Sequence, residues 1–444
     1  MTEPPRDHDG DLRPGPLADL VVLDFSRVLS GPICGRALAD MGADVIKVEP
    51  PAGDLTRFAY PKVNSLALYF TQQNVGKRNL SLDLNRPEAV AVLKALVARS
   101  DVVVENFRPG VMARLGLGWD DLSVLNPRLV YASLTGYGQD GPWRDRRAYA
   151  VAVHAETGTT AAALAARARL GTPGDSVNEP FSHADVYAGL LTLSAILAAL
   201  HHRERTGRGQ HVDVSMAQSM LFVNEHVQAE LSDVDAPGRV LSLAPGESPL
   251  CELADGTMVT IVGHPCSTGT FERYCRAMAR PDLPTDARFA TEADRLDHAS
   301  ELYSIVRDWA GSHHDVATLE ATLAAVGLAM GEVRTVADLA ASDWARARDA
   351  IAEVDDRGRH GGVPNAPFRF SNASARRGAG PPTGASTTGR CWPRPASTTR
   401  RSIASKPMGC CPVASRAADA LDGTAQADEG GDRRAARGRR GVGL

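Results

Sequence analysis

The stretch LADLVVLDFSRVLSGPICGRALADMGADVIKVE, residues 17–49, decides the fold class. Residues 17–25 are apolar and rich in β-branched side chains, which is typical of a buried strand. A turn with glycine and proline opens a helix over residues 33–41, and a glycine ends this helix before a second strand at 45–49. Strand, turn, helix and strand in this order make a βαβ unit, which predicts a parallel sheet.

The same alternation of strands and helices continues along the chain. An amphipathic helix with proline in its first turn is expected at 87–100, and an apolar strand follows it at 101–105. Further strands are expected at 80–84, 129–134 and 211–215, and further helices at 122–127 and from Met216. This alternation predicts a doubly wound, Rossmann-like α/β domain. Because the turn after the first strand lacks a GxGxxG pattern, we infer no nicotinamide or flavin site.

Length, charge and cysteine content exclude several classes of protein. A chain of 444 residues is too long for one ordinary core and suits two or three domains. The net charge of −4 gives no reason to expect a nucleic acid or a membrane as a partner. The 7 cysteines form no CxxC pair, and we find neither a signal-peptide core nor an apolar run of bilayer length. These features predict a cytoplasmic protein.

Changes in composition divide the chain into segments. Beyond the large domain, a strand pair with a turn at Asp255-Gly256 leads into helices near 271–279, 300–310 and 317–326, which predicts a smaller α+β domain. The predicted organisation is a disordered leader (1–16), a large α/β domain (17–224), a small α+β domain (225–335), a return to the large domain (336–370) and a basic tail (371–444).

The tail loses all hydrophobic periodicity. Residues 371–444 hold 13 Arg or Lys against 5 Asp or Glu and are rich in Ala, Gly, Pro, Ser and Thr. Such a segment buries too little apolar surface to offset the entropy of ordering it, so we expect it to be disordered. The composition is also that of a GC-rich gene read in a shifted frame, and the tail is then a frameshift product.

One acidic residue stands at the start of a long apolar helix. In the stretch SHADVYAG, residues 182–189, Ser182 suits an N-cap and Asp185 lies three positions later, where a capping box places an acid. The helix is supported by apolar residues at helical spacing, namely Leu190, Leu193, Ile196, Leu197 and Leu200. Gly207 suits its end. Taken alone, Asp185 is simply a helix cap.

Eight segments in order, between about residues 17 and 370, together resemble the family III CoA-transferases of the CaiB/BaiF type. This group contains formyl-CoA and carnitine-CoA transferases and α-methylacyl-CoA racemase. The matching segments are VLDF (22–25) with SGP (30–32), GADVIKVE (42–49), GKRNLSLDL (76–84), ENFRPG (105–110), NPRL (126–129), GYGQDGP (136–142), DVYAG (185–189) and TGRGQ (206–210).

The resemblance implies an α/β domain with a small second domain, in two chains interlocked as a homodimer. It implies that Asp185 is the nucleophile, which forms a mixed anhydride with the acyl group and then an aspartyl-CoA thioester. The substrates are then acyl-CoA and a small carboxylic acid. The resemblance implies no metal and no bound cofactor.

The resemblance also assigns a binding site for CoA. The corresponding positions are Leu29, Ser30, the segment Leu82 to Asn85, Asn106, Phe107, Arg108, Arg114, Arg147, Ala148 and Tyr149. The three arginines suit phosphate groups, although surface arginines and ordinary turn residues would look the same in sequence. Leu29 stands where formyl-CoA transferase has glutamine, and residues 245–265 lack that enzyme's glycine-rich loop. We therefore do not expect formyl-CoA or oxalate as substrates.

Two alternatives to a transferase stay open. The racemases of the family carry a general-base histidine in a Gly-His-Asp triplet, and Ala148-Tyr149-Ala150 stands there instead. Tyrosine has a pKa of about 10, so it removes an α-proton poorly at neutral pH. His154 is a substitute base or, more simply, a buried helix histidine, and His183 is close enough in sequence to tune Asp185. If the tail is out of frame, the chain is an inactive CoA-binding relic.

Overall fold

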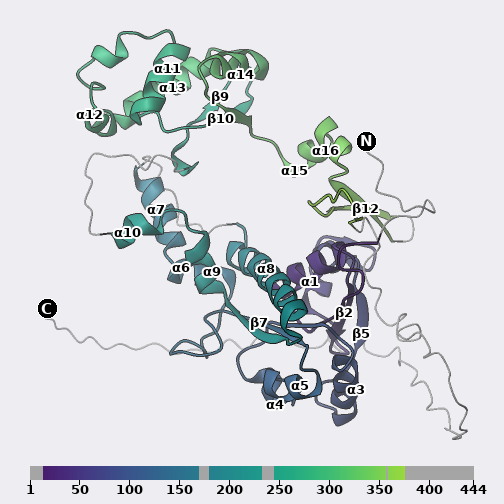
Figure 1. The fold of residues 1–444 in the computed structure, drawn as a ribbon. Helices are drawn as coiled ribbons and strands as arrows, with labels where there is room; N and C mark the ends of the chain where they lie inside the picture. Colours follow the sequence, from purple (N-terminus) through teal and green to yellow (C-terminus); the bar gives the residue numbers. More distant parts are fainter. Residues whose placement is uncertain (1–13, 170–179, 233–244, 357–358, 376–444) are drawn as a thin grey trace, which may run out of the picture. The chain divides into compact units, whose positions relative to one another are not determined.

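A computed structural model of the chain describes residues 14–169, 180–232, 245–356 and 359–375 (Figure 1). The predicted disordered leader (1–16) and basic tail (371–444) fall mostly outside the described residues, which omit 1–13 and 376–444. Gly15 is described and packs closely on Met41 and Gly42, at the end of the first helix. Residues 14–16 are therefore held against the fold, contrary to the predicted disorder.

Six parallel strands form the main sheet. They are β1 (Val21–Asp24), β2 (Asp44–Glu49), β5 (Arg78–Ser81), β6 (Val102–Glu105), β7 (Val130–Thr135) and β8 (Gln210–Ser215). Their order in the sheet is β5-β2-β1-β6-β7-β8, and all five pairings are parallel. The strand order reverses between β1 and β6, where Val22 pairs with both Val45 and Val102. Such a reversal opens a crevice at the carboxyl ends of the two strands.

Helices cover both faces of this sheet, which confirms the predicted doubly wound architecture. On one face α1 (Ser30–Asp40) and α8 (His183–Thr206) share a core with β1, β2, β6 and β7, and Cys34 and Ile196 are fully buried in it. On the other face α3 (Pro87–Val97), α4 (Val111–Arg114) and α5 (Trp119–Leu125) enclose a second core around Leu93 and Leu122. The βαβ unit read from residues 17–49 is present, with α1 beginning at Ser30 rather than at residue 33.

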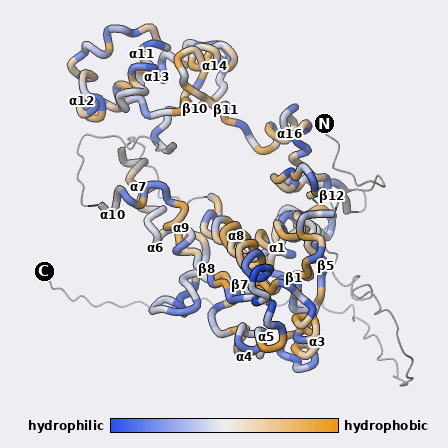
Figure 2. Tube along the Cα trace, in the orientation of Figure 1, coloured by the Kyte–Doolittle hydropathy of each residue, from blue (hydrophilic) through white to orange (hydrophobic). Residues whose placement is uncertain are grey.

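Helix α8 is the longest element described, and it ends at Gly207, which is left-handed with φ 74° as expected for a C-cap glycine. By length and composition α8 is the one described helix that would be able to cross a membrane, and we had predicted no such run. Figure 2 shows that hydrophobic residues make up much of its length. Its buried residues include Leu193 and Ile196 in the core, which accounts for its apolar character in a packed helix.

Residues 50–73 show no helix or strand pattern in the sequence, yet they contain secondary structure. Between β2 and β5 lie a short 3₁₀ helix, η1 (Leu55–Phe58), a small antiparallel pair, β3 (Lys62–Val63) and β4 (Leu66–Ala67), and the helix α2 (Leu68–Asn74). These elements are two to seven residues long, so they are too short to show a hydrophobic period. The sequence of residues 50–73 therefore does not reveal these elements.

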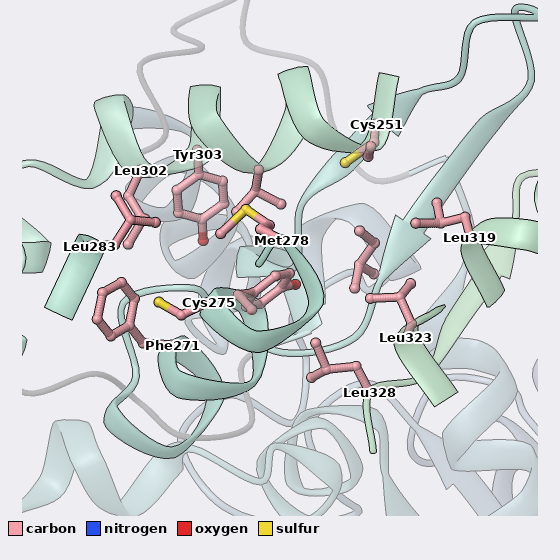
Figure 3. Packing of buried hydrophobic residues seen from close by; sticks show 14 of the residues in the cluster. Cys251, Phe271, Cys275, Met278, Leu283, Leu302, Tyr303, Leu319, Leu323 and Leu328 are labelled. Carbon is pink, nitrogen blue, oxygen red and sulfur yellow. The ribbon is translucent and has the colours of Figure 1, made fainter. Parts of the chain in front are cut away.

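Residues 250–332 build a three-stranded antiparallel sheet with its own core. Its strands are β9 (Leu250–Glu252), β10 (Met258–Ile261) and β11 (Met330–Glu332), and its helices are α11 (Thr268–Ala277), α12 (Glu292–Asp297), α13 (Ala299–Gly311) and α14 (Val316–Ala325). Figure 3 shows the core around Phe271, Met278 and Leu302. The strand pair predicted around Asp255-Gly256 is confirmed as β9–β10. The domain boundaries themselves stay a prediction.

The segment that follows the three-stranded sheet contacts the helices α1 and α2. The antiparallel pair β12 (Ile351–Asp356) and β13 (Arg359–Pro364) contacts α2. The Arg36 guanidinium of α1 donates a hydrogen bond to the Pro364 carbonyl, and Phe368 packs on the core of the first face. The remaining described helices are α6 (Ala150–Glu156), α7 (Thr159–Arg169), α9 (Met216–Val223), α10 (Val227–Leu231), α15 (Val336–Ala340) and α16 (Asp343–Arg348).

Candidate active site

The loops that follow β1 and β6 meet where the strand order reverses. Asn106, directly after β6, holds the first loop with three hydrogen bonds. Its amide oxygen accepts from the Arg27 N–H at 2.8 Å, and its Nδ2 donates to the Arg27 carbonyl at 2.9 Å and to Ser30 Oγ at 3.1 Å. Two of the predicted site residues, Ser30 and Asn106, are thus brought into direct contact at a crevice that suits a ligand.

Asp185 lies at the same place, in the first turn of α8. Its half-buried carboxylate accepts hydrogen bonds from the N–H and the hydroxyl of Ser30 and from the N–H of Ala150. Ser30 is the first residue of α1 and Ala150 the first of α6, so two further helix N-termini point at this carboxylate. Burial raises the pKa of Asp185 despite these hydrogen bonds, which lower it.

The close packing of α8 on α1 places these groups together. At Gly189, a Cβ atom would lie 2.4 Å from the Ser30 carbonyl oxygen and 2.4 Å from Ile33 Cγ2. Any side chain at this position would force the two helices apart. Gly189, one turn after Asp185, therefore allows the Asp185 carboxylate to reach the beginning of α1.

The capping-box prediction for Ser182 and Asp185 was wrong. Ser182 is the N-cap residue, but its side chain makes no capping hydrogen bond, and the Asp185 carboxylate is used elsewhere. The Ala184 N–H instead donates to Nε2 of His154 at 3.1 Å. Because Nε2 accepts this bond, the ring proton resides on Nδ1. His154 is buried and caps α8, so it is not placed as a substitute general base.

His183 stacks on other aromatic rings. Its ring lies 5.7 Å from that of Tyr187 and 5.9 Å from that of Phe181, measured between centroids. The groups that shift the pKa of Asp185 are burial, Ser30 and Ala150. The predicted tuning of Asp185 by His183 thus has no support in these contacts.

The other predicted CoA-binding residues lie on the loops around this crevice. Leu29 is the buried N-cap residue of α1. The Arg27 guanidinium lies 5.0 Å above the Phe107 ring, and Arg108 Nη2 donates to the Asp145 carbonyl at 2.6 Å. The last contact ties the loop after β6 to the segment before α6.

Two of the predicted CoA-binding residues, Leu82 and Asn85, follow β5. Leu82 packs on the core of the second face, which is a structural role. Asn85 is exposed, and its Nδ2 donates to Asp83 Oδ1 at 3.0 Å within its own turn. Their contacts are local, so their assignment to CoA stays a prediction.

Arg114, Arg147 and Tyr149 have exposed side chains. Arg114 ends α4, which begins after the left-handed Gly110 (φ 77°), and Tyr149 is the N-cap residue of α6 with 71% of its surface exposed. Tyr149 thus directly precedes Ala150, whose N–H binds the Asp185 carboxylate.

If Arg114 and Arg147 bind the phosphates of CoA, replacing either by alanine should raise KM for acyl-CoA about tenfold and leave kcat within about threefold. Steady-state kinetics with varied acyl-CoA would measure this. Arg128→Ala, which removes an exposed arginine paired with Glu204, is the control. An unchanged KM in both variants would show that Arg114 and Arg147 are ordinary surface residues.

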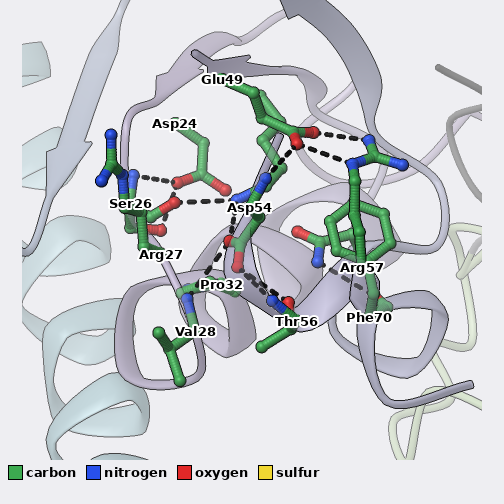
Figure 4. A network of polar contacts seen from close by, with 12 residues as sticks. Asp24, Ser26, Arg27, Val28, Pro32, Glu49, Asp54, Thr56, Arg57 and Phe70 are labelled. Carbon is green, nitrogen blue, oxygen red and sulfur yellow. Dashed lines mark hydrogen bonds and ion pairs between the residues drawn. The ribbon is translucent and has the colours of Figure 1, made fainter. Parts of the chain in front are cut away.

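Sequence reasoning missed Tyr69 on α2. Burial raises the pKa of Tyr69, and the charges of Asp185 and Asp54 raise it further, so the Tyr69 hydroxyl lies within electrostatic reach of the candidate nucleophile. It also missed a set of buried charges beneath the first loop (Figure 4). Lys47 and Lys77 are 0% and 4% exposed and form ion pairs with Asp54 and Asp24. The sequence signals only two of the four, because Asp24 and Lys47 are charged residues within otherwise apolar strands.

Glu105 at the end of β6 is a buried carboxyl next to Asn106. Its Oε2 accepts from the Phe107 N–H at 2.8 Å, and burial raises its pKa to about 7 from 4.5, against hydrogen bonds from Ser133 and Phe107 that lower it. As pH rises from 4.5 to 7, the unfolded carboxyl ionises while the folded one stays protonated. The unfolded state then binds fewer protons, so stability falls over this range.

We therefore expect Glu105→Gln to be more stabilising, or less destabilising, at pH 8 than at pH 4.5, with a difference of roughly 3 kcal/mol at most. Chemical denaturation at the two pH values measures it. Glu320→Gln, at an exposed position on α14, is the control. A pH-independent effect of Glu105→Gln would contradict the raised pKa.

Within the described ranges, no group of three or more His, Cys, Asp or Glu side chains is placed to hold a metal ion. The described cysteines, Cys34, Cys251, Cys266 and Cys275, are free and buried. The groups gathered at Asp185 are its carboxylate, the N–H groups of Ser30 and Ala150, and the Ser30 hydroxyl. Such a set suits acyl chemistry with an anionic intermediate.

Comparison with known proteins gives consistent matches over most of the chain. The family model described as CoA-transferase family III matches residues 17–387. The succinyl-CoA–L-malate CoA-transferase beta subunit of Chloroflexus aurantiacus is 35% identical, over 85% of this chain and 94% of that protein. The succinate–glutarate CoA-transferase of Agrobacterium fabrum is 37% identical, over 66% and 74%. A crystal structure of Rv3272 from Mycobacterium tuberculosis has a TM-score of 0.70 at 31% identity, over 85% of this chain and 99% of that one.

Proposed function

The chain belongs to CoA-transferase family III, and from that premise we propose that it moves CoA between carboxylic acids through covalent intermediates on Asp185. One observation carries the proposal. The Asp185 carboxylate is half-buried at the crevice of the main sheet and accepts hydrogen bonds from the Ser30 N–H, the Ser30 hydroxyl and the Ala150 N–H. A carboxylate that only caps α8 would bind N–H groups of α8 itself, not those at the starts of two other helices.

The geometry suits a nucleophilic carboxylate. Burial raises the pKa of Asp185, which makes the carboxylate more basic and hence a stronger nucleophile than one in water. The Ser30 and Ala150 N–H groups hold it in one orientation. The same donors, at the starts of α1 and α6, would stabilise an oxyanion that forms beside Asp185.

The reaction balances without a metal or a redox group. An Asp185 oxygen bonds to the thioester carbonyl carbon, the C–S bond breaks, and CoA leaves as the thiolate. The thiolate then attacks the Asp185 carbonyl of the mixed anhydride, which gives an aspartyl-CoA thioester and frees the donor acid as a carboxylate. An acceptor carboxylate attacks the carbonyl carbon of this thioester, the C–S bond breaks, and a new anhydride and CoA thiolate form. The thiolate then attacks the acceptor's acyl carbon, the anhydride C–O bond breaks, and the product acyl-CoA and the Asp185 carboxylate are released.

Relatives suggest which substrates to test first. Three of them are named as succinyl-CoA transferases, acting with L-malate, D-citramalate or mesaconate. We therefore propose succinyl-CoA as the donor and a dicarboxylic acid of four or five carbons as the acceptor. Leu29, where formyl-CoA transferase has glutamine, supports the exclusion of formyl-CoA and oxalate. An acetyl-CoA:oxalate CoA-transferase is also a relative, so acetyl-CoA, formyl-CoA and oxalate belong among the substrates to be tested.

We further propose that the protein acts as an interlocked homodimer in the cytoplasm, as the resemblance implies. Size-exclusion chromatography with light scattering tests the dimer. A folded monomer with full activity would rule out the need for a partner subunit.

Intact-mass analysis tests the proposed mechanism. Purified protein is incubated with succinyl-CoA, then with acetyl-CoA, formyl-CoA and branched acyl-CoAs, and is treated with hydroxylamine or borohydride. A CoA adduct that these reagents convert to a modified Asp185 peptide would support the mechanism. Absence of an adduct together with exchange of the acyl-CoA α-proton in heavy water would instead favour a racemase. Neither signal from a cooperatively folded protein would favour the inactive relic.

A further inference from the structure

Val28, two residues before Ser30, has a backbone conformation that a valine seldom adopts. Its φ is 67°, in the left-handed region, where the β-branched side chain collides with the following carbonyl. Glycine or asparagine would normally occupy such a position. A strained residue persists only where its surroundings over-determine it, and such residues gather at functional sites.

The peptide groups around Val28 are held individually by side chains. The Ser26 N–H donates to Asp24 Oδ1 at 2.9 Å, and the Ser26 carbonyl accepts from Lys47 Nζ at 2.8 Å. Asn106 binds both the N–H and the carbonyl of Arg27, as described above. The N–H of Val28 itself donates to Asp54 Oδ2 at 3.2 Å.

Asp54 is in turn fixed from several directions, as Figure 4 shows. Its carboxylate is 1% exposed and pairs with Lys47 Nζ at 3.2 Å, while its other oxygen accepts from the N–H and hydroxyl of Thr56. The Asp54 N–H donates to Glu49 Oε2 at 2.8 Å. Asp54 is thus a rigid acceptor for the N–H of the strained residue, and nothing in the proposed chemistry uses it.

We propose that Asp54 is a positioning residue that keeps Val28 left-handed and so aims the Ser30 N–H and hydroxyl at the Asp185 carboxylate. The inference rests on the proposed role of Asp185. Without the Asp54 bond, Val28 relaxes toward a negative φ, and the peptide that leads into α1 rotates. Ser30 then loses its alignment with Asp185, while the crevice and its exposed arginines remain.

A double-mutant cycle with glycine tests this coupling. Asp54→Asn removes the charge and keeps the shape, and it should slow formation of the Asp185–CoA thioester about tenfold with KM for acyl-CoA changed less than threefold. Val28→Gly adopts the left-handed conformation without strain and should stay within about threefold of wild type. In the double variant, glycine no longer needs Asp54, so its rate should return to within about threefold of Val28→Gly.

Asp101 provides a matched control. Its carboxylate also binds one backbone N–H, that of Val21 at 2.9 Å, and one cation, Arg203 at 2.9 Å, but it does not touch Val28. Val28→Gly should not rescue Asp101→Asn. A double variant at 54 and 28 as slow as Asp54→Asn, or equal rescue of Asp101→Asn, would overturn the proposal.

If Asp54→Asn does not fold, the melting temperatures of two Val28 variants test the proposed strain instead. Val28→Ala and Val28→Gly both lose the valine side chain, yet only alanine, which has a Cβ atom, is strained in the left-handed conformation. Val28→Gly should therefore melt at a higher temperature than Val28→Ala, the reverse of the order at an ordinary position. The opposite order would show that Val28 is not held under strain and would overturn the inference, whether or not Asp185 proves to be the nucleophile.

Discussion

Asp185→Ala is expected to lower the rate of CoA transfer by at least about a thousandfold and to change acyl-CoA binding by no more than a few-fold. Alanine removes the oxygen that attacks the thioester, so no covalent intermediate forms. The binding loops after β1 and β6 keep their own contacts, because Asn106 holds Arg27 and Ser30 independently of Asp185. The loss should therefore appear in kcat rather than in the dissociation constant.

Calorimetric titration with CoA, together with transfer kinetics, separates the two effects. Asp294→Ala is a suitable control, because Asp294 occupies the same third position of a helix, α12, and there it does make a capping box with Thr291. This control should lose some stability and keep its turnover. Full activity in Asp185→Ala would contradict the assignment of Asp185 as the nucleophile.

The pH dependence adds a second check on Asp185. Since the carboxylate is the reacting form, the rate should rise with pH through the pKa of Asp185, which burial places above its usual value. Asp185→Asn should show no such limb on any residual rate.

The fold was largely predictable because its signals are local. Strands such as 101–105 are short apolar runs, and Gly42 and Gly207 are turn residues with φ of 105° and 74°. Handedness and the short connections then leave few topologies for alternating strands and helices. Elements of two to seven residues, such as β3, β4 and α2, carry too few positions for a period to show.

The candidate site was only half predictable, because its decisive contacts join distant parts of the chain. Asp185 stands at capping-box spacing from Ser182, and local reasoning therefore read it as a cap. Its partners are Ser30 and Ala150 on other helices, and no spacing rule connects them. The resemblance to the family pointed to Asp185 as the nucleophile, but it did not reveal the strained Val28, because valine itself gives no sign of a left-handed conformation in the sequence.

Lys77→Met is expected to have the largest effect on stability, about 3–5 kcal/mol. Lys77 Nζ is fully buried and donates to Asp24 Oδ2 at 2.8 Å, to the Pro32 carbonyl at 2.8 Å and to Asn74 Oδ1 at 2.9 Å. Methionine fills a similar volume but leaves the Asp24 carboxylate without its closest cation in the protein interior. Equilibrium denaturation measures the loss. Asp24→Asn combined with Lys77→Met removes both charges and should recover part of it.

The neighbouring residue offers the control. Arg78 pairs with Asp44, but 34% and 45% of these side chains are exposed, so Arg78→Met should cost no more than about 1 kcal/mol. If Lys77→Met and Arg78→Met lose the same free energy of unfolding, burial of the Lys77–Asp24 pair does not determine the loss.

The pH dependence of the Lys77→Met effect follows from Asp24. Burial raises the pKa of Asp24, but the charges of Lys77 and Lys47 outweigh burial and hold it below its usual value. Asp24 thus contributes stability that is present above pH 3.8 and is lost as the pH falls further. Without Lys77 its pKa should rise, so the stability deficit of Lys77→Met should be large at pH 7 and shrink as the pH approaches 4. A constant deficit would mean that lost packing, and not the unpaired carboxylate beneath the Ser26–Ser30 loop, is what destabilises the variant.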